Sequence, residues 1–283
     1  MNSETCKTFL TKRLTEQYSA REAQNLTRII LEDAFGLASE EGFHAPTMED
    51  IEELLVQLDK GIPIQYIVGK SHFYDYILKV NPAVLIPRPE TEELVYYILE
   101  YYKSTQTSPQ DIFEIGTGSA CITLALADKF SSSNILSIDK SNEALSVAQE
   151  NLDTYAVSNV TLKEIDFLNT SQVELVSKPY DLIVSNPPYI PLSETKQVGA
   201  STQKHEPELA LYTSDNKGIE FYQAIASFAR KNLKKGGVVF CEINEFRKQE
   251  TIDCFKKETF EYINCIKDMQ GKDRVLLAKL RNT

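Results

Sequence analysis

The sequence predicts an α/β fold, with a mostly parallel sheet that follows a small helical domain. From residue 111 onward, short apolar strands alternate with amphipathic helices, a pattern that builds a parallel sheet covered by helices on both faces. The last two predicted strands, 262–268 and 274–280, are joined by a short turn and must therefore be antiparallel to each other. Residues 1–60 show helical spacing of apolar residues and no strand signal.

The composition is that of an ordinary soluble globular protein, with 283 residues, 42% of them hydrophobic and 25% charged. No apolar run approaches the ~20 residues of a membrane helix, and the N-terminus lacks a secretory signal. The five cysteines are scattered, so we expect reduced thiols in a cytoplasmic protein, without a metal site. The net charge of −11 argues against direct binding of nucleic acid.

We expect residues 1–61 to form a helical bundle. Thr47 and Asp50 resemble a capping box at the start of its last helix, and Gly61 ends that helix. The segment 62–90 alternates apolar and polar residues and holds four prolines, which indicates a β-hairpin or linker. Residues 91–283 then form the domain that contains the sheet.

The elements of this domain are read in order from hydrophobic periodicity. The predicted strands are 111–115, 134–139, 160–166, 181–186, 236–243, 262–268 and 274–280. The predicted helices are 120–130, 141–155, 219–233 and 246–257.

The stretch EIGTGSA, residues 114–120, directly follows the first strand and opens a helix. Gly116 and Gly118 allow a tight turn and a close approach of a ligand to the backbone. The stretch lacks the third glycine of the dinucleotide fingerprint, and the chain has no phosphate-binding G-x-x-x-x-G-K-[ST] loop. A glycine pair alone is more often a structural turn, so the case depends on the neighbouring strands.

The next two strands end in residues suited to a nucleoside. Asp139 ends the second strand, where a carboxylate can accept from both ribose hydroxyls. Asp166 and Phe167 end the third, where a carboxylate and an aromatic ring can hold an adenine by its amino group and its face. Each acid alone could simply be solvated, but three features at successive strand ends favour a nucleoside pocket. Since no phosphate site is present, S-adenosylmethionine is favoured over NAD.

The fourth strand ends in VSNPPYIP, residues 184–191. Pro187 and Pro188 stiffen the loop because neither has an N–H to donate. The Asn186 side-chain oxygen and the Pro187 carbonyl can together accept both hydrogens of an –NH2 group, and Tyr189 can stack on the flat group that bears it. Such a site catalyses methyl transfer to a weakly nucleophilic nitrogen by orientation and preorganised electrostatics.

NPPY after a strand resembles the methyltransferases that modify planar –NH2 groups. These include the adenine-N6 methyltransferases and the release factor glutamine methyltransferase family, called PrmC or HemK. Further segments match the latter family in pattern and order, over nearly the whole chain. They are QYIVG (65–69), NPAVLIPRPETEELV (81–95), EIGTGSACITLALA (114–127), HEPELAL (205–211) and GKDRV (271–275).

The resemblance implies a Rossmann-like class I S-adenosylmethionine-dependent methyltransferase, with residues 91–283 as its catalytic domain. That family methylates the side-chain amide nitrogen (N5) of the Gln in the GGQ loop of class 1 peptide chain release factors, with S-adenosylhomocysteine as the other product. Residues 1–61 and the hairpin would dock the release factor, and we expect a monomer. The carried-over donor-binding residues are Gly116, Thr117, Gly118, Ser119, Ala120, Asp139, Phe167 and Asn186, and Asn186, Pro187, Pro188 and Tyr189 would hold the target amide. Arg88, Glu90 and Thr91 would lie in a loop that covers the donor, and Glu206 with Pro207 would shape the substrate channel.

Two departures from the family pattern stand near the site. Ala120 replaces a usual glycine, and its methyl group could tighten the donor pocket. Asn244 stands where glycine is common, and because Asn tolerates positive φ we expect the turn to keep its shape.

Alternatives remain at this stage. An adenine-N6 methyltransferase would use the same NPPY geometry on a flipped base, although the acidic charge argues against it. A non-catalytic S-adenosylmethionine sensor would have no need of Asn186 and Tyr189. The N-terminal helices could also be a structural cap on the catalytic domain.

Overall fold

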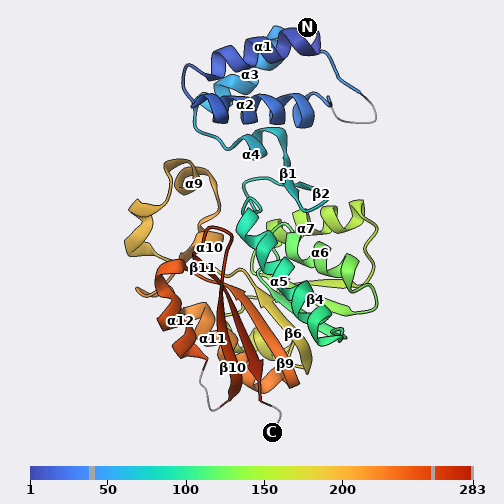
Figure 1. The fold of residues 1–283 in the computed structure, drawn as a ribbon, viewed down its shortest axis with the longest axis vertical. Helices are drawn as coiled ribbons and strands as arrows, with labels where there is room; N and C mark the ends of the chain where they lie inside the picture. The colour runs from blue at the N-terminus through green and yellow to red at the C-terminus, as the bar shows by residue number, and fades with distance from the viewer. Residues whose placement is uncertain (38–41, 256–258, 282–283) are drawn as a thin grey trace. The chain divides into compact units, whose positions relative to one another are not determined.

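The computed structural model describes residues 1–37, 42–255 and 259–281. Contacts divide the chain into two compact units, Met1–Lys70 and Ser71–Thr283, each with its own hydrophobic core (Figure 1). This division lies between the boundaries at 61 and 90 that were placed from the sequence.

The first unit is helical. Its elements are α1 (Ser3–Leu14), α2 (Ala20–Ile29), the π-helical turn η1 (Ile30–Ala34), α3 (Met48–Asp59) and α4 (Ile64–Val68). The predicted capping box starts α3: Thr47 Oγ1 accepts from the Asp50 N–H at 3.1 Å, and Asp50 Oδ2 accepts from the Thr47 N–H at 2.8 Å. The reciprocal bonds satisfy two backbone donors that the first turn of a helix leaves free.

A β-hairpin or linker is predicted for the segment 62–90; the hairpin is present, but the first part of the segment is helical. Ile64–Val68 forms α4, which ends where Gly69 adopts a φ of +70°. A single helical turn is too short to show a helical period, and its Ile and Val favour a strand reading. The hairpin follows as β1 (Lys70–Phe73) and β2 (Tyr76–Lys79). The long helix α5 (Pro89–Thr105), which was not predicted, begins with Pro at its first position.

The second unit is built on a seven-stranded sheet in the order β10-β11-β9-β6-β3-β4-β5. Its strands are β3 (Asp111–Ile115), β4 (Asn134–Asp139), β5 (Val160–Glu164), β6 (Tyr180–Ser185), β9 (Leu233–Glu242), β10 (Phe260–Lys267) and β11 (Asp273–Leu280). β11 runs antiparallel to both of its neighbours, and the remaining pairs are parallel. The predicted sheet with an antiparallel end is confirmed.

Helices cover both faces of the sheet (Figure 1). Neighbouring residues of a strand point to opposite faces, so Ile112 of β3 packs into one core and Phe113 into the other. The first core contains residues of α5, α6 (Cys121–Lys129) and α7 (Asn142–Thr154), and the second those of α11 (Glu220–Asn232), with α12 (Lys248–Cys254) beside it. The predicted end of the last helix, at 256–257, lies outside the described residues. The shorter elements are α8 (Thr170–Glu174), β7 (Ile190–Pro191), η2 (Leu192–Gln197), α9 (Ala200–His205), α10 (Glu208–Leu211), β8 (Tyr212–Thr213) and η3 (Glu245–Arg247).

The topology places a crevice at the carboxyl ends of β3 and β6. β3 pairs with β4 on one side and with β6 on the other, so the connections leave these strands in opposite directions. Ligands of open parallel sheets bind at such a switch point. In the described residues, no helix is long and apolar enough to span a membrane.

Candidate active site

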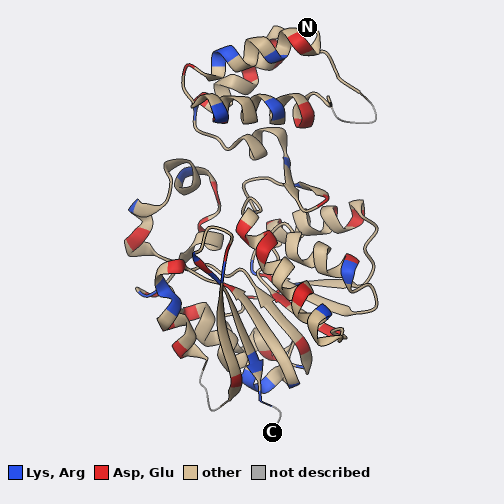
Figure 2. Cartoon of the chain, in the orientation of Figure 1, with Lys and Arg blue, Asp and Glu red and all other residues tan. Residues whose placement is uncertain are grey.

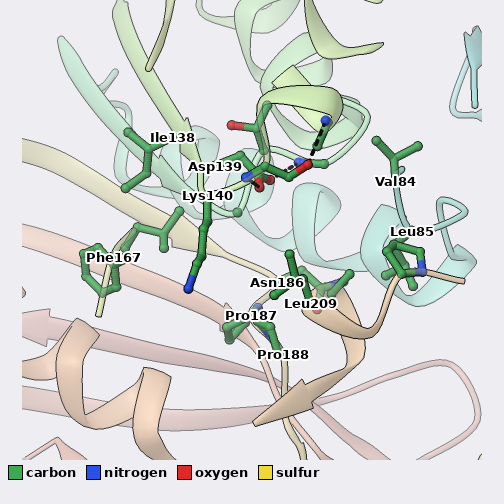
Figure 3. A pocket seen from close by; sticks show the side chains of 18 of the residues that line it. Val84, Leu85, Ile138, Asp139, Lys140, Phe167, Asn186, Pro187, Pro188 and Leu209 are labelled. Carbon is green, nitrogen blue, oxygen red and sulfur yellow. Dashed lines mark hydrogen bonds between the residues drawn. The ribbon is translucent and has the colours of Figure 1, made fainter. Parts of the chain in front are cut away.

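A cavity of about 500 Å³ opens at the carboxyl ends of the parallel strands. Its size is in the range of small-molecule binding sites. Figure 3 shows Asp139 and Asn186 near its middle, with Phe167 toward one end and Leu85 toward the other. The sequence-predicted residues that line it are Arg88, Thr91, Gly116, Thr117, Gly118, Ser119, Asp139, Asp166, Phe167, Asn186, Pro187, Pro188 and Pro207. Ala120 and Tyr189 do not line this cavity.

The glycine loop is fastened to the neighbouring strand. The N–H groups of Gly116 and Thr117 both donate to the carbonyl of Ile138, at 2.9 and 3.0 Å. Gly116 has a φ of +82°, and a Cβ there would lie 3.8 Å from the Asn186 carbonyl oxygen. The loop therefore needs glycine for its backbone conformation more than for space.

A buried polar network lies beneath this loop. Thr123 donates to Ser137 Oγ at 3.0 Å, and the Thr117 hydroxyl shares a hydrogen bond with the same oxygen at 2.7 Å. Ser137 in turn donates to Glu114 Oε2 at 2.6 Å. Burial raises the pKa of Glu114 to about 8, and the nearby Asp139 charge acts in the same direction. The network ties the loop to β3 and β4 from below.

Asp139 supports the loop from the cavity side. Its Oδ2 accepts from the Gly118 N–H and its Oδ1 from the Ser141 N–H, both at 2.9 Å. Each carboxylate oxygen has a second acceptor position, so the group can still accept ribose hydroxyls. The backbone bonds fix the direction in which those positions point.

The third strand end places both predicted residues, Asp166 and Phe167, in the wall of the cavity. Asp166 Oδ1 accepts from the Leu168 N–H at 3.0 Å, and its Oδ2 pairs with Lys140 Nζ at 2.8 Å. As in Asp139, each oxygen keeps a second acceptor position, so the carboxylate can still accept from an adenine amino group. Phe167 packs edge-on against Phe228, with ring centroids 5.7 Å apart, and forms an apolar wall of the cavity.

Ala120 and Asn244, which stand where the family usually has glycine, differ from what was expected of them. Ala120 has a φ of +64° and a fully buried side chain, so its methyl group packs in the core and not in the cavity. The left-handed conformation costs an alanine about 1 kcal/mol. Asn244 has a φ of −68°, so the expected positive φ is absent; its Oδ1 accepts from the Phe246 N–H at 3.0 Å and shapes the turn that way.

A second cavity, of about 160 Å³, adjoins the first. Tyr189 and Glu242 line the second cavity only, whereas Asn186 lines both. The other residues shared by the two cavities are Leu85, Arg88 and Ala210. The NPPY loop thus stands between two spaces, with Pro188 toward the larger and Tyr189 toward the smaller.

A chain of hydrogen bonds holds this loop in place. Asn186 Nδ2 donates to Thr91 Oγ1 at 3.0 Å, and the Thr91 hydroxyl donates to Glu242 Oε2 at 2.7 Å. The Tyr189 hydroxyl lies 3.4 Å from Glu242 Oε1. Burial raises the pKa of Glu242 to about 7. Sequence reasoning did not assign Glu242 to the site; the available signal was a carboxylate that ends a buried strand.

The two segments that were expected to cover the donor and to shape the substrate channel are joined by a partly buried ion pair. Arg88 pairs with Glu206, whose other carboxylate oxygen accepts from the Ile86 N–H at 3.2 Å. The pair links the 83–88 stretch to the segment that carries Pro207, and residues of both line the larger cavity. Glu90, expected beside them, does not line it.

Comparisons with known proteins agree with this architecture. The family model described as a methyltransferase domain matches residues 107–279. A 16S rRNA N2 methyltransferase from T. thermophilus, solved in complex with AdoMet and guanosine, has a TM-score of 0.54 at 19% identity, over 75% of this chain and 50% of that one. The chain therefore has the Rossmann-like fold of class I S-adenosylmethionine-dependent methyltransferases.

Curated relatives define the family more narrowly. A release factor glutamine methyltransferase of Flavobacterium psychrophilum is 37% identical over 81% of this chain and 80% of its own length. One of Bacteroides thetaiotaomicron is 33% identical over 95% of this chain and 97% of its own. At this level of identity and coverage, the chain belongs to the release factor glutamine methyltransferase family.

Proposed function

We propose that this protein transfers the methyl group of S-adenosylmethionine to the side-chain amide nitrogen (N5) of the glutamine in the GGQ loop of class 1 release factors. The observation that carries the proposal is the place of Asn186 in the walls of both cavities. A methyl donor in the larger cavity and an amide in the smaller one would meet at this residue. The donor would leave as S-adenosylhomocysteine.

The larger cavity has the features that such a donor requires. The half-buried Asp139 offers acceptor positions for ribose hydroxyls, and Phe167 offers an apolar wall for adenine. The loop from Gly116 to Ser119 would contact the methionine part. S-Adenosylmethionine supplies an electrophilic methyl group when bound, and these residues bind and orient the molecule that carries it.

The acceptor side is arranged for a weak nucleophile. Because Asn186 Nδ2 donates a hydrogen bond to Thr91, the Asn186 Oδ1 atom is left to accept from a substrate –NH2. The Pro187 carbonyl would accept the second hydrogen, and Tyr189 would flank the amide plane. Two aimed acceptors increase electron density on the nitrogen and hold its lone pair toward the methyl group. The nitrogen forms the new bond to carbon, the sulfur keeps the electron pair, and one N–H proton is released.

The charge of the protein supports a protein substrate over a nucleic acid. The net charge is −11, and Figure 2 shows Lys and Arg interspersed with Asp and Glu in both units. A nucleic-acid surface would instead gather basic residues on one face.

A methyl-transfer assay with labelled S-adenosylmethionine tests the proposal. The substrates are a release factor, its variant with the GGQ glutamine changed to alanine, bulk DNA and bulk RNA. We expect label on the intact release factor and none on the other three. Label on DNA or RNA alone would replace the proposal with the adenine-N6 class.

Substitution of Asn186 tests the role assigned to it. In Asn186→Ala we expect turnover to fall by about 100-fold or more, because the aimed acceptor is lost. Donor affinity, measured by calorimetry, should stay within about threefold, since the other donor contacts remain. Asn134→Ala is the matched control, because Asn134 begins β4 and so lies at the edge of the sheet away from the cavities. Normal turnover combined with lost donor binding would contradict the assigned role.

A further inference from the structure

The geometry points to Thr91 and Glu242 as positioning residues, which fix the atom of the Asn186 carboxamide that faces the target nitrogen. The inference rests on the proposed function, in which Asn186 accepts from an –NH2 group. A carboxamide presents an acceptor on one side and a donor on the other, and the two orientations have nearly the same shape. Only one orientation suits an –NH2 substrate, so something must select it.

The three residues come together from distant parts of the chain. β6 and β9 are parallel neighbours in which Ser185 pairs with Cys241, so the next residues, Asn186 and Glu242, lie at adjacent strand ends. Thr91 arrives from the first turn of α5. Thr91 and Glu242 are each 2% exposed, so neither depends on solvent for its hydrogen bonds.

The direction of the hydrogen bonds follows from proton counting. Above its pKa of about 7 the Glu242 carboxylate is ionised and only accepts, so the single hydroxyl proton of Thr91 is then committed to Glu242 Oε2 at 2.7 Å. Toward Asn186 the same hydroxyl can then only accept, and it does so from Nδ2 at 3.0 Å. The carboxamide is thereby held with Oδ1 away from Thr91. Glu242 selects the orientation of Asn186 through Thr91.

Glu242 holds the other side of the same site as well. Its second oxygen, Oε1, is the partner of the Tyr189 hydroxyl at 3.4 Å. Its backbone carbonyl accepts from the Tyr222 hydroxyl at 3.0 Å, which fixes the strand end itself. A single buried carboxylate thus positions both the acceptor atom and the ring beside it.

A packing role and a positioning role for Thr91 predict opposite orders of activity for two substitutions. Thr91→Ser keeps the hydroxyl and loses the methyl group, whereas Thr91→Val keeps the shape and loses the hydroxyl. Positioning predicts that Ser is tolerated and Val is not. Packing at a site that is 2% exposed predicts that Val is tolerated and Ser is the more damaging.

The kinetic test compares these variants on the release factor. We expect Thr91→Val and Glu242→Gln to lower kcat on the order of 10- to 100-fold, because the carboxamide is no longer held in one orientation. Gln in place of Glu242 can donate to Thr91, which frees the hydroxyl proton for Asn186 Oδ1. In Thr91→Ser kcat should stay within about threefold of wild type, because the hydroxyl is kept. Donor affinity should be unchanged in Glu242→Gln, since Glu242 lines the smaller cavity only. A kcat for Thr91→Ser at or below that of Thr91→Val would overturn the inference.

A spectroscopic test does not depend on the substrate. In 15N-labelled protein, the side-chain –NH2 signals of Asn186 are identified by their loss in Asn186→Asp. One of the two protons should exchange slowly with solvent in wild type and Thr91→Ser, and rapidly in Thr91→Val. If the Asn186 –NH2 proton exchanges as slowly in Thr91→Val as in wild type, the positioning role of Thr91 is wrong. If the release factor is not methylated at all, the proposed function fails, while this measurement still decides the positioning of Asn186.

Discussion

Glu114 is a carboxyl group enclosed beneath the glycine loop, with 1% of its surface exposed. Its pKa is raised from an ordinary 4.5 to about 8, chiefly by burial. The folded protein therefore binds a proton that the unfolded chain releases between these two values. Stability from this group is fully present below pH 4.5 and is lost as the pH rises through about 8.

We expect Glu114→Gln to flatten the pH dependence of stability across this window. The amide keeps an acceptor for Ser137 but does not titrate, so the fall in unfolding free energy from pH 5.5 to pH 8 should shrink by at least ~1 kcal/mol. Urea denaturation at the two pH values measures it. Glu242, with a pKa of about 7, still titrates in the variant, so a part of the slope should remain. An unaltered slope would show that Glu114 does not carry the proton.

Single residues differed in how far the sequence could place them. The strand-end position of Asp139 and Asn186 follows from apolar runs in the chain, which is why both were assigned to one edge of the sheet. The pairing of Asp166 with Lys140 and the core packing of the Ala120 methyl group depend on the path of neighbouring backbone. No local pattern contains that information.

At the scale of elements, the stretch before α5 and the segment 205–211 both contribute residues to the wall of the larger cavity. Arg88 and Glu206 connect them, and the Glu206 side chain is 1% exposed while that of Arg88 is 35% exposed. A carboxylate at such depth depends on its partner, whereas the guanidinium retains contact with water. The two halves of the pair should therefore not be equivalent.

We expect Arg88→Met to lower the unfolding free energy by roughly 2–4 kcal/mol, because it leaves a buried charge without a partner. Glu206→Gln should cost less, since the amide still accepts from the Ile86 N–H. The double variant should recover more than half of the loss seen in Arg88→Met. Chemical denaturation measures all three. Arg13→Met, which removes the more exposed pairs with Glu16 and Asp59, is the control and should cost less than about 1 kcal/mol.

An equal cost for Arg88→Met and Glu206→Gln would contradict this account. It would mean that water reaches the Glu206 carboxylate when its partner is removed. The segments that carry Arg88 and Glu206 would then be packed less tightly than the buried Glu206 side chain indicates.

At the scale of the whole molecule, both cavities belong to the second unit, and the first unit is a separate helical domain. Both cavities are lined by residues 83 and beyond, all within Ser71–Thr283. The helical unit has a core of its own, which includes Leu10, Ile30 and Ile51. The residues that line the two cavities thus all belong to the second unit, and the docking of a release factor by the N-terminal helices stays a prediction.

Removal of residues 1–70 should separate the two roles. We expect the remaining chain to keep its donor affinity within about threefold, while KM for the release factor rises by about tenfold or more, the effect of ~1.4 kcal/mol of lost binding. Calorimetry and steady-state kinetics measure the two quantities. Thermal unfolding with and without the donor checks that the shortened protein is folded. An unchanged KM would leave the helices a structural role only.

The sequence by itself determined the features that depend on neighbours in the chain. The alternation of strands and helices, the capping box at Thr47 and the glycine turn at Gly116 follow from periodicity and from local hydrogen-bonding groups. These are interactions over a few residues, so the local sequence specifies them.

Only the tertiary structure decided how the Asn186 carboxamide is held. The path from Asn186 through Thr91 to Glu242 joins three segments that are each at least 50 residues apart in the chain. Strand register and the docking of α5 bring them within hydrogen-bond distance. Burial then commits each polar group to partners within the protein, since an unpaired one would lose its hydration without compensation. The residue types of NPPY are set by the local sequence, whereas the orientation of the Asn186 side chain depends on the folded sheet.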